Sequence, residues 1–122
     1  MRLKSMMVFV TDFAEAKRFY GEVLGFSLAA ESADRLEFAS GGPPLVAFRA
    51  AKPAPITDYA NEAASVFVFE TEDVAARQAE LSSKGVRFLH QRPAQGADGR
   101  YAAFYDPFGN VHEIADRQTG VM

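Results

Sequence analysis

The chain has 122 residues, a formal net charge of −3, and 48% hydrophobic and 24% charged residues. This length and balance indicate one globular domain over residues 1–122 and exclude a disordered chain. The absence of cysteine excludes disulfide frameworks, thiol nucleophiles and thiolate metal sites. The acidic balance argues against nucleic acid as a partner, and no apolar run reaches the about 18 residues that would indicate a membrane span. We therefore expect a cytoplasmic protein.

The first half of the chain is predicted to form one strand, one helix and three strands. A short apolar segment at residues 3–10 indicates the first strand. Apolar residues then recur every three or four positions over residues 13–24, which is typical of a helix. Asp12 is the expected N-cap and Gly25 the C-terminal cap of this helix. The remaining strands are expected at residues 26–30, 35–39 and 45–49.

The same order of elements returns after a connector at residues 50–64. A strand at 65–70 precedes a helix that begins at Asp73 and ends before Gly85. Three strands are expected to follow, separated by a loop at 92–99 and a turn at 106–110, and residues 116–122 are expected to form a frayed tail. The expected strands are 86–90, 101–105 and 111–115.

The two halves form an internal repeat. Asp73 and Gly85 correspond to Asp12 and Gly25, with a period of about 60 residues. The pattern predicts an α+β fold of two βαβββ repeats, about 3–49 and 65–115.

Two short motifs resemble the vicinal-oxygen-chelate superfamily, which holds glyoxalase I, extradiol dioxygenases, fosfomycin-resistance enzymes and bleomycin-resistance proteins. Phe19-Tyr20 with Leu24-Gly25-Phe26 resembles its FY…LGF signature, and the segment 106–114 resembles DPxGNxxEL. The resemblance implies two curved sheets that form a cup around a ligand. It also implies a homodimer, because many proteins of this length in the superfamily build their cups across a dimer interface.

The resemblance locates four positions that hold a metal in the metal-using members, on the first and last strands of each repeat. In this sequence they are Ser5, Ala47, Val66 and Glu113. Alanine and valine have no lone pair to offer, and serine is a poor ligand for a divalent transition metal.

The two histidines do not complete this set of metal-ligand positions. Successive strand side chains point to opposite faces, so His112 faces away from the cup if Glu113 faces into it. We therefore expect no divalent metal and no other cofactor. Two alternatives remain open: a register shifted by two residues, and carboxylates such as Glu37 and Glu70 in place of histidine.

Alternation along the strands divides their side chains between two faces. The helix-packed face is almost wholly apolar, as expected for a core, and contains Met6, Val8, Val10, Leu36, Phe38, Val46, Phe48, Phe67, Phe69, Ala102, Phe104 and Ile114. The cup face mixes apolar and aromatic residues with a few charges, which is typical of a small-molecule site. The expected ligand-binding residues are Ser5, Met7, Phe9, Glu37, Ala47, Arg49, Val66, Val68, Tyr101, Ala103, Tyr105 and Glu113.

Several of these residues also have simpler interpretations than a role in ligand binding. Met7 and Phe9 also fit dimer or sheet packing, and His112 fits an outward-facing surface histidine. His90 precedes a loop that would lie near the cup mouth. Glu113 is the candidate catalytic residue: either a relic of a metal site, or a buried acid with a raised pKa that accepts a proton.

These observations favour a metal-free homodimer that binds or sequesters a small, partly aromatic molecule without catalysis. The alternative is a metal-dependent lyase, isomerase, transferase or dioxygenase of the same superfamily. A third possibility is a module whose cup forms only a protein interface.

Overall fold

The computed structural model describes residues 1–54, 59–62, 65–96 and 99–116. The described residues form two compact units, each built on one βαβββ repeat. Unit 1 contains residues 1–54 together with Pro107–Asn110, and unit 2 contains the other described residues. The predicted tail beyond residue 116, connector positions 55–58 and 63–64, and loop positions 97–98 lie outside the described residues. The predicted α+β class and internal repeat are confirmed.

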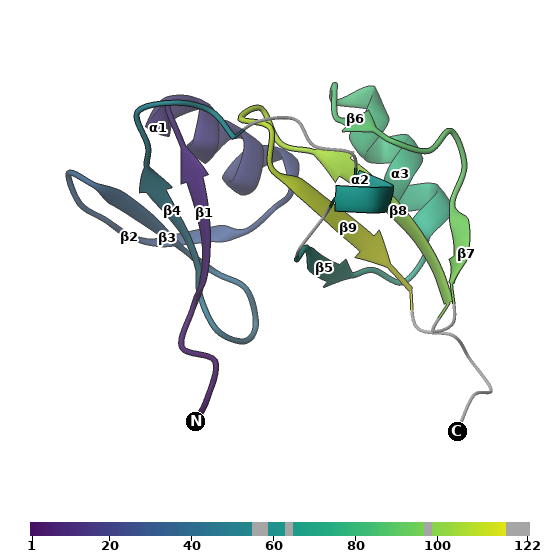
Figure 1. Ribbon diagram of the computed structural model, residues 1–122, viewed down its shortest axis with the longest axis horizontal. Helices are drawn as coiled ribbons and strands as arrows, with labels where there is room; N and C mark the ends of the chain where they lie inside the picture. The colour runs from purple at the N-terminus through teal and green to yellow at the C-terminus, as the bar shows by residue number, and fades with distance from the viewer. Residues whose placement is uncertain (55–58, 63–64, 97–98, 117–122) are drawn as a thin grey trace. The chain divides into compact units, whose positions relative to one another are not determined.

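Unit 1 is a four-stranded sheet with a helical segment across one face (Figure 1). The strand order is β1-β4-β3-β2, and the first strand pairs in parallel with the last. Because a parallel pair needs a crossover, the helical segment and the hairpin strands lie between them in the chain. The elements are β1 (Met6–Val10), α1 (Phe13–Ala16), η1 (Lys17–Val23), β2 (Ser27–Glu31), β3 (Arg35–Ala39) and β4 (Leu45–Arg49).

The predicted first helix begins where expected, but most of it is wound as a π-helix. The Asp12 carboxylate accepts a hydrogen bond from the Glu15 backbone N–H at 3.1 Å, which caps α1. In η1 the hydrogen bonds span five residues, as between the Leu24 N–H and the Phe19 carbonyl. Gly25 has a φ of 89°, the left-handed conformation that glycine adopts without steric cost.

Unit 2 repeats this topology with strand order β5-β9-β8-β6, and β5 runs parallel to β9. Helix α3 contacts β6 and β8. Two elements were not predicted: α2 in the expected connector, and β7, which pairs with β8 inside the expected loop. The elements are α2 (Tyr59–Glu62), β5 (Phe67–Glu70), α3 (Val74–Ser83), β6 (Arg87–Phe88), β7 (Ala94–Gly96), β8 (Gly99–Tyr105) and β9 (Val111–Ala115).

Each sheet has one helix-covered face and one face on the opposite side, which we call the open face. Apolar side chains on the helix-covered faces form the core of each unit, with Leu36 and Phe38 in unit 1 and Ala102 and Phe104 in unit 2 fully buried. On the open faces, Met7, Phe9 and Val68 remain 45–54% exposed. The alternation predicted for β1, β3, β5, β8 and β9 is confirmed by the strand registers.

The facing predicted for β4 was wrong by one residue. Ala47 pairs with Val8 and Leu36, which places it on the helix-covered face, where it is fully buried. Arg49 shares that face, and its guanidinium lies 4.0 Å from the centre of the Phe13 ring in α1. Since Leu45–Phe48 are apolar on both faces and Arg49 packs on the Phe13 ring, alternation had no polar side chain that marks the open face.

The turn Pro107–Asn110 belongs to unit 1 and is held there by backbone contacts. The Phe108 carbonyl accepts a hydrogen bond from the Ala54 N–H at 2.9 Å, and the Asn110 side chain donates to the Phe9 carbonyl at 3.0 Å. A Cβ at Gly109 would lie 2.6 Å from the Ala54 carbonyl oxygen, so this position requires glycine. The residue types of the second sequence motif are therefore explained largely by the backbone geometry of this turn.

Among the described residues, no helix combines the length and the apolar character needed to cross a membrane.

Candidate ligand site

A cavity of about 210 Å³ lies at the open face of the unit 2 sheet. Strands β5, β8 and β9 bring Val68, Tyr101 and Glu113 to this face, since Val68 pairs with Glu113, and Tyr101 pairs with Ala115. The hairpin of β7 and β8 contributes Gly96 and Gly99. The complete lining is Val68, Gly96, Gly99, Arg100, Tyr101, Glu113, Ala115 and Asp116.

Glu113 is a half-buried carboxyl group of this cavity. Its neighbours across the sheet are Val68 on β5 and Ala103 on β8, whose apolar side chains cannot form a hydrogen bond with the Glu113 carboxyl group. The Tyr59 hydroxyl in α2 donates a hydrogen bond to Glu113 Oε2. Burial raises the pKa of Glu113 above its usual range, because desolvation disfavours the charged form.

The second acidic group, Asp116, is paired with the cation of the cavity. The Arg100 backbone N–H donates to Asp116 Oδ1 at 2.9 Å, and its guanidinium donates to Oδ2 at 3.0 and 3.1 Å. These bonds, the backbone one foremost, lower the pKa of Asp116. Arg100 Nη2 also lies 3.8 Å from Asp73 Oδ1. The Arg100 guanidinium is therefore engaged by two carboxylates of its own unit.

Tyr101 is the aromatic wall of the cavity. Its ring makes an edge contact with the His90 ring, with centroids 5.7 Å apart, and the His90 carbonyl accepts a hydrogen bond from the Gln78 side chain at 2.7 Å. A Cβ at Gly96 would lie 3.2 Å from Tyr101 Cδ1, so glycine lets the ring pack against β7. His90 thus contacts the Tyr101 ring but is not one of the residues that line the cavity.

Three of the predicted ligand-binding residues, Val68, Tyr101 and Glu113, line this cavity. Ala103 and Tyr105 share its face of the sheet but lie outside the lining, and Tyr105 packs beneath the Arg87 guanidinium at 4.3 Å. Val66 precedes β5 and is half-buried. The sequence analysis missed the contributions of Gly96, Gly99, Arg100, Ala115, Asp116 and Tyr59.

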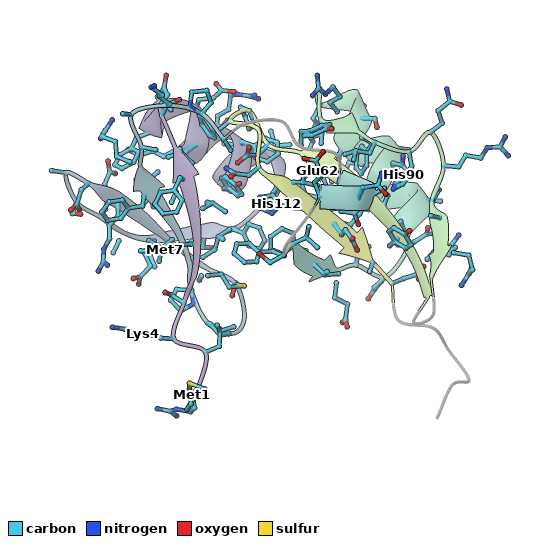
Figure 2. The ribbon with its side chains drawn as sticks, in the orientation of Figure 1. Met1, Lys4, Met7, Glu62, His90 and His112 are labelled. Carbon is cyan, nitrogen blue, oxygen red and sulfur yellow. The ribbon has the colours of Figure 1, made fainter. Side chains whose placement is uncertain are left out.

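The predicted site residues of unit 1 divide between its two faces. Met7, Phe9 and Glu37 lie on the open face, because Met7 and Glu37 both pair with Val46, and Phe9 pairs with Phe48. Figure 2 labels Met7 on β1. Ser5 precedes β1 and is half-buried. Ala47 and Arg49 lie on the helix-covered face, as described above, which removes them from this surface.

His112 faces away from Glu113, as alternation predicted, but the expectation that it lies on the protein surface was wrong. It is 2% exposed and lies in the core of unit 2 (Figure 2). Its ring stacks on Phe67 with centroids 5.7 Å apart, and it also contacts Phe69 and Phe104. Burial lowers the pKa of His112 to about 4, against a smaller opposing effect of Asp106.

The residues around Glu113 do not fit a divalent metal. Its two cross-strand neighbours are Val68 and Ala103, and His112 points to the opposite face. In the part of the chain that the structure describes, no three His, Asp or Glu side chains converge on one point. A transition-metal site needs several nitrogen, oxygen or sulfur ligands in a fixed geometry, and neither cross-strand neighbour adds a side-chain ligand to the Glu113 carboxylate.

Comparison with known proteins identifies the class of protein that has this fold. The model of the Glyoxalase/Bleomycin resistance protein/Dioxygenase superfamily matches residues 2–114. The chain therefore belongs to this superfamily.

Three proteins are similar to this chain in sequence or in structure. The uncharacterized protein YetH of Bacillus subtilis (strain 168) is 31% identical over 117 residues, covering 90% of this chain and 93% of that protein. The structure of SMU.1112c is 23% identical with a TM-score of 0.79, covering 94% of this chain and 98% of the other.

A mutant of the fosfomycin resistance protein FosX from Listeria monocytogenes, in complex with Mn(II) and 1S,2S-dihydroxypropylphosphonic acid, has a TM-score of 0.77. It is 16% identical, covering 97% of this chain and 91% of the other. At these identities the two structures support the fold alone.

Proposed function

We propose that this protein binds a small, partly aromatic molecule at the open face of unit 2, without a divalent metal and without catalysing a reaction. The observation that carries the proposal is the composition of the cavity. Tyr101 and Val68 give it an aromatic and an aliphatic wall, while a few polar groups remain for orientation. Glu113, at the position for which the family resemblance implies a metal ligand, has Val68 and Ala103 as its neighbours across the sheet.

The proposal includes a homodimer. Met7 and Phe9 are 45% and 51% exposed on the open face of unit 1, and apolar side chains of this size favour a covered surface. Light scattering after size exclusion tests this part: the expected mass is that of two chains, and a single-chain mass over the accessible concentration range contradicts it.

Thermal denaturation in the presence of candidate ligands tests the binding proposal. A molecule that binds only the native state raises the melting temperature with its concentration. We expect stabilisation by members of a panel of planar aromatic compounds, and its loss in Tyr101→Ala. Leu28→Ala, an exposed change in unit 1, is the control and retains the shift. Stabilisation by micromolar Mn, Co, Ni or Zn chloride instead would support a metal-dependent lyase, isomerase, transferase or dioxygenase.

A second candidate function is proton transfer by Glu113 without a metal. It is favoured by the raised pKa of this half-buried carboxyl, since a base works best with a pKa near the working pH. If a bound compound exchanges a carbon-bound proton with D₂O solvent, loss of this exchange in Glu113→Gln with binding retained supports catalysis. Equal exchange in the wild type and Glu113→Gln rejects it.

A further inference from the structure

The charges that line the unit 2 cavity are unequal. One cationic side chain, Arg100, faces two acidic ones, Glu113 and Asp116. The Arg100 guanidinium donates hydrogen bonds to Asp116 and lies near Asp73, a third carboxylate. The cation of the cavity is thus already neutralised from within the unit, and an incoming anion would have to break these contacts.

Glu113 is in the opposite situation. In the described part of the chain no lysine or arginine forms an ion pair with its carboxylate, and its hydrogen-bond donor is the neutral Tyr59 hydroxyl. A half-buried carboxylate gains most from a charged donor, because charge-assisted hydrogen bonds are about twice as strong as neutral ones. An ammonium or amidinium group in place of the hydroxyl would supply that charge.

We infer that the ligand of this cavity is a small organic cation, in which an amine or amidine group replaces the Tyr59 hydroxyl on Glu113 while an attached ring lies against Tyr101 and Val68. This inference rests on the proposed binding function and names its ligand class. The cavity volume of about 210 Å³ limits the size of that ligand. Drug-sized ligands occupy pockets of about 300–1,000 Å³, so the bound part is nearer to a single substituted ring.

Three probes of nearly equal shape test the charge preference directly. Benzamidine is a cation at pH 7.5, benzamide is neutral and benzoate is an anion. Titration of the wild-type protein, followed by ¹H–¹⁵N chemical shifts, gives a dissociation constant for each probe and locates it in the chain. We expect benzamidine to bind about tenfold more tightly than benzamide, benzoate to bind most weakly, and the largest shifts at Tyr101 and Glu113.

Two variants assign the preference to Glu113. Glu113→Gln keeps the shape of the side chain and is expected to weaken benzamidine about tenfold while benzamide is unchanged. Tyr59→Phe removes the competing hydroxyl and is expected to strengthen benzamidine binding. Glu80→Gln, with the same charge change on α3, is the control and leaves all three constants unchanged.

Equal binding of the three probes, or tighter binding of benzoate, overturns the cation assignment. Failure of benzamidine to bind at about 10 mM overturns it as well, because a charge-assisted contact together with ring burial should give a dissociation constant below that concentration. These outcomes are distinguishable from failure of the proposed function. The aromatic panel reports on binding as such, and a neutral or anionic compound that stabilises the protein would keep the function and reject the cation.

Discussion

The open faces of the two units show how one topology supports two kinds of surface. In both units the first strand pairs in parallel with the last, and the residue five positions before the helix N-cap lies on the open face. That residue is Met7 in unit 1 and Val68 in unit 2. Its partner on the last strand is Val46 in unit 1 but Glu113 in unit 2. On the next strand, Glu37 pairs with Val46 in unit 1, whereas Ala103 pairs with Glu113 in unit 2. The two open faces therefore differ in the strand that carries the carboxylate, which in unit 2 lies next to the first strand.

The helix-covered faces differ in the same pair of strands. Leu45 in unit 1 occupies the position of His112 in unit 2, and both are buried. A leucine there costs nothing to desolvate at any pH, whereas a buried histidine resists protonation. The comparison teaches that the backbone pattern is shared while polar chemistry on both sides of β9 is particular to unit 2.

The largest expected effect separates the covered and the open faces. Phe104→Ala removes a fully buried ring from the unit 2 core and should lower the free energy of unfolding by about 3–5 kcal/mol. Phe9→Ala removes a ring that is 51% exposed and should cost about 1 kcal/mol. Urea denaturation of both variants, at concentrations too low for the proposed homodimer to form, checks the difference. Equal losses under these conditions would contradict the assignment of Phe9 to an exposed face.

The next effect is a pH dependence that comes from His112. Its pKa is about 4 in the folded protein and about 6.5 when unfolded, so the unfolded chain binds the proton more tightly. The contribution of His112 to the free energy of unfolding is therefore fully present above pH 6.5. It is lost as the pH drops from 6.5 toward 4, by about 3 kcal/mol in all.

Denaturation curves of the wild type and of His112→Gln between pH 4 and 7 measure this contribution. The variant is expected to be less stable at pH 7 but to lose less stability on acidification. His112→Phe serves as a second variant, because its ring suits the stack on Phe67. If the wild type and both variants share one pH dependence, the histidine is not buried in its neutral form.

The smallest expected effect concerns the helix caps, where the two units should behave alike. Asp12 and Asp73 each accept a hydrogen bond from a backbone N–H three residues later, at 3.1 and 3.0 Å. Replacement of either by alanine should cost about 1 kcal/mol. Replacement by asparagine, which keeps an accepting oxygen, is the control for each. A large loss at one cap alone would break the equivalence of the two repeats.

The repeat itself was predictable because its signals are local. Asp12 and Asp73 precede apolar helical periods, and Gly25 and Gly85 follow them with φ values of 89° and 91°. Alternation also separated the two faces of β5, β8 and β9, where charged or tyrosine side chains mark the open face. It failed on β4, because Leu45–Phe48 is apolar at every position and Arg49 covers the Phe13 ring instead of facing the other way.

The candidate site was predictable only in part. Val68, Tyr101 and Glu113 follow from alternation, and His112 could have been assigned to the core by the same rule, since it alternates with Glu113 on β9. Tyr59 could not have been found, because its contact with Glu113 joins residues 54 positions apart through a connector without a repeating pattern. The pairing of Arg100 with Asp116 depends equally on the register of β8 against β9.

Elemental analysis of the protein, purified without chelator, tests the central claim most directly. The account predicts less than about 0.1 mole of divalent transition metal per mole of chain, because Glu113 lacks the further ligands that such an ion needs. About one mole of Mn, Fe, Co, Ni or Zn per mole of chain would contradict it, since binding at that level requires a built site.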